Sequence, residues 1–242
     1  MTVNDRLTAL RGWMREEKID AYIIPSSDPH QSEYVAEHWK SREWISGFTG
    51  SAGTVVVTVD YAGIWTDSRY FLQGEMETAS SEFELQKMHN QFGNYYRDWI
   101  IDNLSNGQTV AVDGQLFSNG QCDMLKKAFD SEGLKFRIDA DGISPTWTDR
   151  AAIPMNEIYV HDAKYAGKTR TERLNEVRAK MVEQKADHHL TTTLDDIGWT
   201  LNIRGTDIDF NPVAICYLVV SKTYSTLFID KVKVPVAIQN EL

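Results

Sequence analysis

The sequence predicts an α/β fold made of two related units in tandem, each a mixed β-sheet flanked by helices. Three observations support this prediction. Amphipathic and apolar segments alternate along the chain, a fifteen-residue stretch occurs twice, and the elements that follow each copy come in the same order. With 242 residues, 42% of them hydrophobic, the chain is long enough to bury a core in one large domain or in two modest ones.

The repeated stretch predicts the first helix of each unit. It reads RLTALRGWMREEKID from Arg6 and RLNEVRAKMVEQKAD from Arg173. A gapless alignment pairs identical residues, namely Arg6/Arg173, Leu7/Leu174, Arg11/Arg178, Met14/Met181, Glu16/Glu183, Lys18/Lys185 and Asp20/Asp187. The apolar residues of each copy recur at helical spacing, which indicates an amphipathic helix with one face in the core.

The segments after each helix predict the sheet. In the first unit AYIIPSS indicates a strand, a helix leads to WISGFTGSAG, and TVVVTVD and IWTDSRYF indicate two more strands. In the second unit HHLTTT, LDDIGWTLNIRGTDI, VAICYLVV and TLFID follow in the same order. Because a short turn separates the last two strands of each unit, we expect them to form an antiparallel pair.

The two units differ in how far they continue. The first goes on through a helix around FGNYYRDWIIDNL, a strand at TVAVDG, a helix at DMLKKAFDSEG and a strand at KFRID, whereas only VPVAIQNEL follows TLFIDKVKV in the second. A segment rich in Pro, Gly, Asp and Thr separates the units. We therefore expect a complete first domain at residues 1–145, a linker at 146–165 and an incomplete second domain at 166–242.

Charge and cysteine content restrict the class of protein. A formal net charge of −10 argues against nucleic-acid and anionic-membrane partners, which require clustered Lys and Arg. Cys122 and Cys216 are too few for a disulfide framework and indicate a reducing compartment. The N-terminus has no signal-peptide core, and no stretch approaches the roughly 20 apolar residues of a membrane span. We expect a soluble cytoplasmic protein.

The segment SSDPHQSEYVAEH concentrates acidic and histidine side chains. Asp28 followed by Pro29 is typical of a helix start, and Gln31 completes a capping-box spacing, so the sequence favours a capped, solvent-exposed helix that runs to about Trp39. The alternative is a metal site that includes His30 with nearby carboxylates. The spacing matches neither H-E-x-x-H nor H-x-x-E-H, so the helix remains the favoured interpretation.

The glycine-rich stretch GFTGSAG, residues 47–53, predicts a tight loop before a buried strand. A phosphate-binding loop would lead into a helix, whereas this one leads into TVVVTV. A nucleophile elbow would need glycine where Thr49 stands, so Ser51 is disfavoured as a nucleophile.

Four other polar positions are candidates for a structural or functional role. Asp67 and Arg69 lie two apart in WTDSRYF, which predicts either a strand-end ion pair or an arginine presented at a domain edge to a substrate carboxylate or a neighbouring subunit. Arg204 and Asp207 are expected to brace the loop NIRGTDIDFNP. The pair of histidines that opens HHLTTT indicates packing or surface positions.

Four stretches of the chain together resemble one family of enzymes. DPHQSEYVAEHWKSREWISGFTGSAGTVVVT, IWTDSRYFLQ, PTWTDR and LDDIGWTLNIRGTDIDFNPVAICYLVV are similar, in order along nearly the whole chain, to the cytosolic three-domain Xaa-Pro aminopeptidases (aminopeptidase P). The resemblance implies two creatinase/prolidase N-terminal-like α/β domains, followed in the family by a catalytic "pita-bread" domain. That domain holds two divalent metals, typically manganese, and removes the N-terminal residue of peptides with proline at the second position.

The same resemblance implies that the catalytic residues and metal ligands lie outside this chain, in the absent catalytic domain. Arg69 matches a family arginine that lies toward the active-site opening or the subunit interface. We therefore expect an inactive N-terminal portion that restricts substrate access and aids formation of a homodimer, and that binds no cofactor itself.

Two alternatives stay open at this point. The chain could be a non-catalytic peptide- or protein-binding module on the same scaffold, as in the pseudo-peptidase domain of certain histone chaperones. It could also be a self-contained metal hydrolase that uses Asp28, His30 and Glu33.

Overall fold

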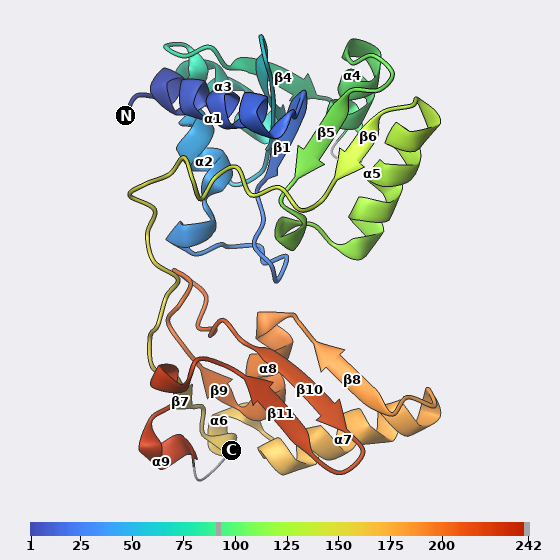
Figure 1. Cartoon of the computed structure of the whole chain (residues 1–242). Coiled ribbons are helices and arrows are strands. Elements are labelled where there is room, and N and C mark those ends of the chain that lie inside the picture. The colour runs from blue at the N-terminus through green and yellow to red at the C-terminus, as the bar shows by residue number, and fades with distance from the viewer. Residues whose placement is uncertain (91–92, 240–242) are drawn as a thin grey trace. The chain divides into compact units, whose positions relative to one another are not determined.

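The computed structural model describes residues 1–90 and 93–239, which form two compact units. One unit comprises Met1–Gln31 and His38–Ala151, and the other comprises Ser32–Glu37 and the chain from Ala152 onward. Both units combine helices with β-strands (Figure 1), so the predicted α/β fold class is confirmed.

The first unit contains a six-stranded mixed sheet with strand order β4-β3-β2-β1-β5-β6. Its strands are β1 (Ala21–Pro25), β2 (Thr54–Thr58), β3 (Ala62–Asp67), β4 (Glu84–Met88), β5 (Thr109–Val112) and β6 (Lys135–Arg137). The β1–β2 and β2–β3 pairs are antiparallel, and the β3–β4, β1–β5 and β5–β6 pairs are parallel. The expected antiparallel pairing of the last two repeated strands is therefore confirmed in this unit.

Helices cover both faces of this sheet. They are α1 (Val3–Glu17), α2 (Ser41–Ser46), α3 (Phe71–Thr78), α4 (Tyr95–Asn103) and α5 (Asn119–Ser131). On one face Leu10 of α1 and Ile45 of α2 pack against Val57, and on the other Ile100 of α4 and Phe129 of α5 belong to the second core cluster. The helix predicted around FGNYYRDWIIDNL begins at Tyr95, and its first position, 92, lies outside the described residues. Central strands buried on both faces explain why AYIIP and TVVVT are almost continuously apolar.

The second unit has a smaller, three-stranded antiparallel sheet with strand order β11-β10-β8. Its elements are β7 (Tyr159–Val160), α6 (Ala163–Ala166), α7 (Arg170–Glu183), β8 (His188–Thr191), α8 (Leu194–Leu201), β9 (Ile203–Arg204), β10 (Tyr217–Ser221), β11 (Ser225–Phe228) and α9 (Val236–Gln239). β7 and β9 form a separate two-stranded sheet. Helices α7 and α8 pack on one face of the main sheet, where Leu218 and Val220 are fully buried.

The internal repeat extends to individual hydrogen bonds. Thr2 and Thr169 each form a capping box at the start of the long helix, and Lys18 and Lys185 follow its end in the left-handed conformation, with φ of 58° and 55°. These matching caps fix the length of the helix in both units.

One arginine of each long helix also makes the same contact in both units. Arg11 Nε donates to Thr58 O at 3.0 Å, and Arg178 Nε donates to Ser221 O at 3.0 Å. The two units are therefore structural copies of one another in helix, first strands and hairpin, as the sequence repeat predicts.

The prediction of a helix from Asp28 to Trp39 is wrong. The segment is an irregular turn with Gln31 at φ 56°, followed by a single 3₁₀ turn at Glu37–Trp39. Asp28 Oδ1 accepts from His30 N at 3.0 Å, while Gln31 Nε2 donates to the distant Leu116 O at 3.0 Å. Such side-chain bonds to the backbone compete with helix formation. Asp28 and His30 are buried, so the prediction of a solvated segment is also wrong for these two residues.

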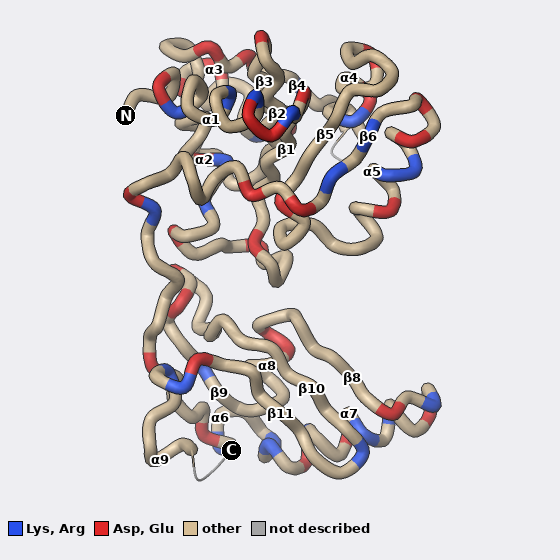
Figure 2. Tube along the Cα trace, viewed as in Figure 1, with Lys and Arg blue, Asp and Glu red and all other residues tan. Residues whose placement is uncertain are grey.

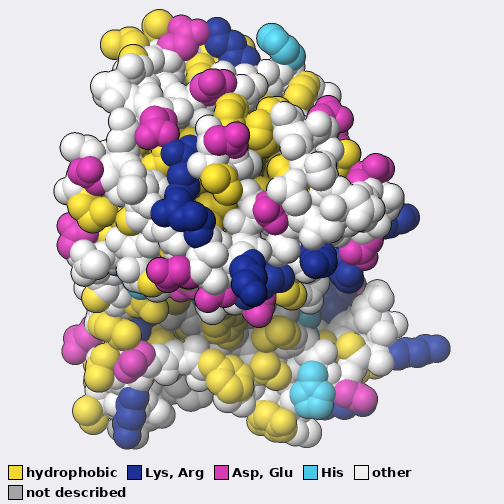
Figure 3. Space-filling model, turned by 45° about the horizontal axis from the view of Figure 1, so that its top comes forward, with side chains coloured by type: hydrophobic (Ala, Val, Ile, Leu, Met, Phe, Trp, Pro, Cys, Tyr) yellow, Lys and Arg dark blue, Asp and Glu magenta, His cyan; other side chains and the backbone are white. Residues whose placement is uncertain are grey.

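Charges of both signs are spread along the chain (Figure 2) and mixed on the visible surface (Figure 3). None of the helices in the described residues has the length and apolar character needed to cross a membrane.

The residues after β6 stay attached to the first unit through Tyr22. Its buried hydroxyl donates to Ala140 O at 2.8 Å and accepts from Gly142 N at 3.0 Å. Burial raises the pKa of Tyr22, so the phenol stays protonated and keeps both bonds. A little further on, Trp147 stacks on Trp44 with ring centroids 5.0 Å apart.

Replacing Tyr22 by Phe should therefore destabilise the first unit. The change leaves a buried N–H and a buried carbonyl without their partner, which costs about 1–3 kcal/mol. Urea unfolding of the variant and the parent chain measures the difference. Tyr70→Phe is the matched control, because its hydroxyl bonds Ser51 at an exposed position where water can replace it. Equal losses in the two variants would contradict the prediction.

Candidate functional site

Arg69 is the second residue after the end of β3 and lies in the 3₁₀ turn Ser68–Tyr70. Asp67 caps this turn by accepting from Arg69 N at 3.1 Å. The Asp67 carboxylate also accepts from Arg69 Nε at 2.9 Å and from Nη2 at 2.8 Å, so the ion pair is bidentate. The predicted ion pair is present, although the strand ends at Asp67 instead of continuing through the arginine.

The two partners of this ion pair differ in exposure. Asp67 is buried at the end of β3, whereas 61% of the Arg69 side chain is open to solvent. Hydrogen bonds from Arg69 lower the pKa of the Asp67 carboxyl, and the same carboxylate raises the pKa of Arg69. One edge of the guanidinium is therefore held by a buried anion while the group remains charged and accessible.

The loop at residues 47–53 lies beside this arginine. The Arg69 guanidinium is 5.1 Å from the centre of the Tyr70 ring, and Tyr70 Oη lies 2.6 Å from Ser51 Oγ in the loop. Ser51 thus hydrogen bonds a tyrosine hydroxyl instead of a histidine, which agrees with its disfavoured role as a nucleophile.

A buried arginine holds the same loop from the inside. Arg42 donates to the carbonyls of Phe48 and Gly50 and, through Nε, to Ser26 Oγ at 2.8 Å. Burial lowers the pKa of Arg42 to about 10. A Cβ on Gly50 would lie 2.3 Å from Phe48 Cζ, so the backbone approaches too closely for any other residue. The predicted tight loop is confirmed, and its cause is close packing around one guanidinium.

Of the residues considered for a metal site, Asp28 and His30 belong to the first unit and Glu33 belongs to the second. Across residues 1–90 and 93–239, no three His, Cys, Asp or Glu side chains converge as ligands of a metal ion would. This finding gives no support to a self-contained metal hydrolase that uses Asp28, His30 and Glu33.

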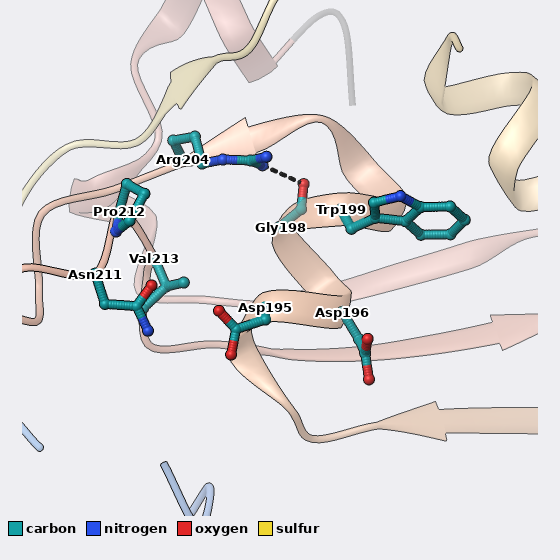
Figure 4. Close-up of a pocket in the computed structure, with 8 residues that line it drawn as sticks. All are labelled: Asp195, Asp196, Gly198, Trp199, Arg204, Asn211, Pro212 and Val213. Atoms are coloured by element: carbon teal, nitrogen blue, oxygen red, sulfur yellow. Dashed lines mark hydrogen bonds between the residues drawn. The ribbon is translucent and has the colours of Figure 1, made fainter. Parts of the chain in front are cut away.

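The second unit contains a cavity of about 630 Å³ between α8 and the loop after β9 (Figure 4). Arg204 enters from one side, and Asp195 and Asn211 lie on the other. Arg204 Nη1 donates to Gly198 O and to Ile203 O, both at 2.8 Å. The arginine therefore braces the end of α8 against β9, as predicted.

Asp207 braces the same loop by a buried ion pair. Its Oδ2 accepts from Ile215 N at 2.7 Å and from Lys233 Nζ, and Lys233 also donates to Ile215 O at 3.0 Å. Both charged side chains are buried, so each depends on the other for its stability in the core. The expected bracing role of Asp207 is confirmed, while the part played by Lys233 had no signal in the sequence.

The two histidines of β8 are exposed, in agreement with the predicted surface positions. They alternate across the strand, and His189 lines a groove beside α7.

Comparison with protein families gives two matches. The creatinase/prolidase N-terminal domain matches residues 6–143, and a second model of the same description matches residues 149–242. Each unit of the structure thus corresponds to one family domain.

Comparison with curated proteins and solved structures adds longer relatives. The chain is 38% identical to Xaa-Pro aminopeptidase 1 of Dictyostelium discoideum over 96% of its length, and 38% identical to aminopeptidase P2 of Arabidopsis thaliana over 100%. A Caenorhabditis elegans X-prolyl aminopeptidase, described as a cytosolic enzyme with a di-nuclear active site, superposes with a TM-score of 0.93 at 32% identity over 99% of this chain. The chain spans 38%, 35% and 41% of the three relatives, respectively.

Replacing Asp67 by Asn tests the ion pair while keeping a capping oxygen. At neutral pH the variant should lose less than about 1 kcal/mol, because the arginine is exposed and the pair is screened by solvent. The folded-state pKa of Asp67 lies below its ordinary value of 3.8, so its contribution is complete above that value and is lost as the pH falls through the folded pKa. Unfolding free energies of both proteins should therefore converge below about pH 4. A difference that is constant from pH 6 to pH 2 would contradict this origin.

Proposed function

Because this chain belongs to the creatinase/prolidase N-terminal domain family, we propose that it is the non-catalytic N-terminal portion of an Xaa-Pro aminopeptidase. Such an enzyme removes the N-terminal residue of a peptide whose second residue is proline. The observation that carries the proposal is 38% identity to Xaa-Pro aminopeptidase 1 over 96% of the chain and to aminopeptidase P2 over 100%. The Caenorhabditis elegans structure, with a TM-score of 0.93, supports it at the level of the fold.

We place the hydrolytic chemistry outside this chain. The curated relatives are more than twice as long as the part that this chain matches, and the described residues bring no three metal-ligating side chains together. Two divalent metals, manganese by our expectation, would then be held by a catalytic domain of the longer polypeptide. The name of the structural neighbour, with its di-nuclear active site, is consistent with this arrangement.

The function left to these two units is steric and electrostatic. Rigid domains beside an active-site opening exclude long or folded substrates, and water exclusion strengthens each polar contact at the site. By the same reasoning we propose that these units contribute to a homodimer, and that the enzyme works in the cytoplasm, as the nematode neighbour does by its description.

Arg69 is the residue of this chain that we propose to act at the opening. Asp67 holds its Nε and Nη2 edge, and the exposed remainder of the guanidinium can donate to a peptide carboxylate or to a neighbouring subunit. Because the buried partner fixes the rotamer, less side-chain entropy is lost when a second anion binds. Asp67 accordingly positions the guanidinium, and Arg69 itself contacts the peptide carboxylate or the neighbouring subunit.

Assays of two proteins test whether the hydrolytic residues lie outside this chain. The two proteins are this 242-residue chain and the polypeptide extended by whatever its gene encodes after Leu242. With added Mn²⁺ and an Xaa-Pro tripeptide, only the extended chain should release the N-terminal residue. Robust turnover by the 242-residue chain would refute the proposal. An extended chain that binds the peptide without cleaving it would favour a binding module on the same scaffold.

Arg69→Ala in the extended chain tests the contact itself. Loss of a charge-assisted hydrogen bond should lower kcat/KM about 10- to 100-fold for tripeptides with a free carboxylate. A C-terminally amidated peptide should lose much less, since the carboxylate is absent. Arg137→Ala is the matched control, because Arg137 forms a comparable surface pair with Asp139. If the variant instead dissociates the dimer in sedimentation and leaves both peptides equally affected, the arginine serves the subunit interface.

A further inference from the structure

A cavity of about 520 Å³ lies in the first unit between the turn that joins β2 to β3 and the last turn of α4, and its size is typical of a small-molecule site. Asp60 of the turn and Asp20, which directly precedes β1, both line it. The lining residues all belong to the described part of the chain, and none of them is Lys or Arg. Arg11, which donates to Thr58 O in the same turn, is paired with Glu82 at 2.7 Å. The cavity therefore combines two negative charges with no cation of its own.

Both carboxylates have acceptor capacity left for a ligand. Asp60 is exposed, and its Oδ1 accepts from Thr58 Oγ1 at 3.1 Å. Asp20 accepts from Gln108 Nε2 at 3.0 Å and from Thr109 N at 2.7 Å. All three donors are uncharged, and an ionised carboxylate offers about four lone-pair sites. Each carboxylate can therefore accept from a charged donor in addition.

Two aromatic rings and the end of a helix complete the lining. Trp99 stacks on Tyr61 with ring centroids 4.4 Å apart, and both side chains line the cavity. The faces of such rings attract cations. Asn103 and Leu104, the last residue of α4 and its C-cap, also line the cavity, and α4, which is described in full, has no basic residue in its last turn. Because the helix dipole is negative at this end, it adds to the preference for a cation.

The turn between β10 and β11 in the second unit has the same backbone hydrogen bonds as the turn between β2 and β3. Thr58 N donates to Tyr61 O at 2.8 Å, and Ser221 N donates to Tyr224 O at 2.8 Å. Tyr61 N donates to Thr58 Oγ1 at 3.1 Å, as Tyr224 N donates to Ser221 Oγ at 3.0 Å. Position 59 in one turn therefore corresponds to position 222 in the other.

At this position the second unit carries a cation. Lys222 Nζ donates to the carboxylate of Asp187, which is the counterpart of Asp20 in the repeat. The first unit has Val59 in place of the lysine. It thus retains the carboxylate of this ion pair and lacks the ammonium group, and the cavity lies beside that carboxylate.

We propose that this cavity binds a primary alkylammonium group, carried either by the lysine side chain of a peptide or by a free polyamine. The ammonium group donates to Asp60 and Asp20, and the alkyl chain behind it packs on the rings of Trp99 and Tyr61, as the stems of lysine side chains do on apolar surface. A quaternary ammonium group is disfavoured because it has no N–H to donate to the carboxylates. The site belongs to the first unit alone and stands independently of the proposed enzymatic role.

Titration of the 242-residue chain with n-butylammonium chloride at low ionic strength, followed by ¹H–¹⁵N NMR, tests the site. The signals of the Trp99 indole N–H and of the amides at residues 58–61 should shift and saturate with a Kd in the millimolar range. 1-Butanol has the same alkyl chain without the charge and should bind at least about tenfold more weakly.

Three variants connect the binding to the named residues. Asp60→Asn should weaken n-butylammonium binding at least about fivefold, because one carboxylate charge is lost. Val59→Lys should abolish the binding, since it supplies the cation that Lys222 provides in the second unit. Asp123→Asn removes the same charge from an exposed position of α5 outside the cavity, and it should bind like the parent chain. Asp60 and Val59 are exposed, so both variants should fold.

Three results would overturn the proposal. The first is the absence of a saturable shift up to about 50 mM n-butylammonium, and the second is equal affinity for 1-butanol. The third is equal weakening by Asp60→Asn and Asp123→Asn, which would indicate a diffuse effect of net charge. This comparison decides the matter even if Val59→Lys does not fold.

Two further probes distinguish the sources of the ammonium group. N-acetyl-lysine amide represents the lysine side chain of a peptide, and 1,5-diaminopentane represents a free polyamine. Tighter binding of the diamine by more than about fivefold would assign the site to a polyamine, because its second charge then also contributes. Equal affinity would assign the site to a lysine side chain.

Discussion

An arginine near the start of each long helix donates to the carbonyl of a tryptophan on the following short helix, and this contact ties the two helices together in both units. Arg6 reaches Trp44 O and Arg173 reaches Trp199 O, and each guanidinium also lies over the indole ring. A guanidinium removed from water requires acceptors, so the end of the short helix cannot move away from the long helix without leaving a charge unsatisfied. The chain that leaves the tryptophan is thereby directed into loop 47–53 in the first unit and toward β9 and the loop after it in the second.

The arginine–tryptophan contact is common to both units, but the loop that follows the short helix is held by different interactions in each. In the first, Arg42 binds backbone carbonyls, and a glycine permits the close approach. In the second, a longer loop is held by the Lys233–Asp207 pair. Ion pairs of this kind stabilise little when compared with apolar packing, but they fix one geometry because breaking them is costly. The two loops can therefore differ in sequence while the surrounding scaffold stays the same.

The repeated helix, the strands and the hairpins could be predicted because each depends on local periodicity that the sequence carries in full. The ion pair between Asp67 and Arg69 was predictable for the same reason, since the partners are two residues apart. The conformation of the segment after Asp28 could not be predicted in this way. Its capping signals fit both a helix start and a side-chain-stabilised turn, and the choice is made by a bond from Gln31 to Leu116, which no local pattern contains. Lys233 likewise finds Asp207 only through the tertiary fold.

The strands of the second unit have apolar residues on both faces of the sheet, although only one face is covered in the described residues. An antiparallel sheet with one solvated face normally alternates apolar and polar residues, with the polar ones outward. Here the covered face has Leu218 and Val220, yet the outward positions on the same strands and their neighbours include Leu190, Val219 and Phe228. This pattern belongs to a sheet that is buried on both sides, as β1 and β2 are. A sequence that keeps apolar residues on both faces of three strands is therefore suited to a more completely covered sheet, in which those side chains are removed from water.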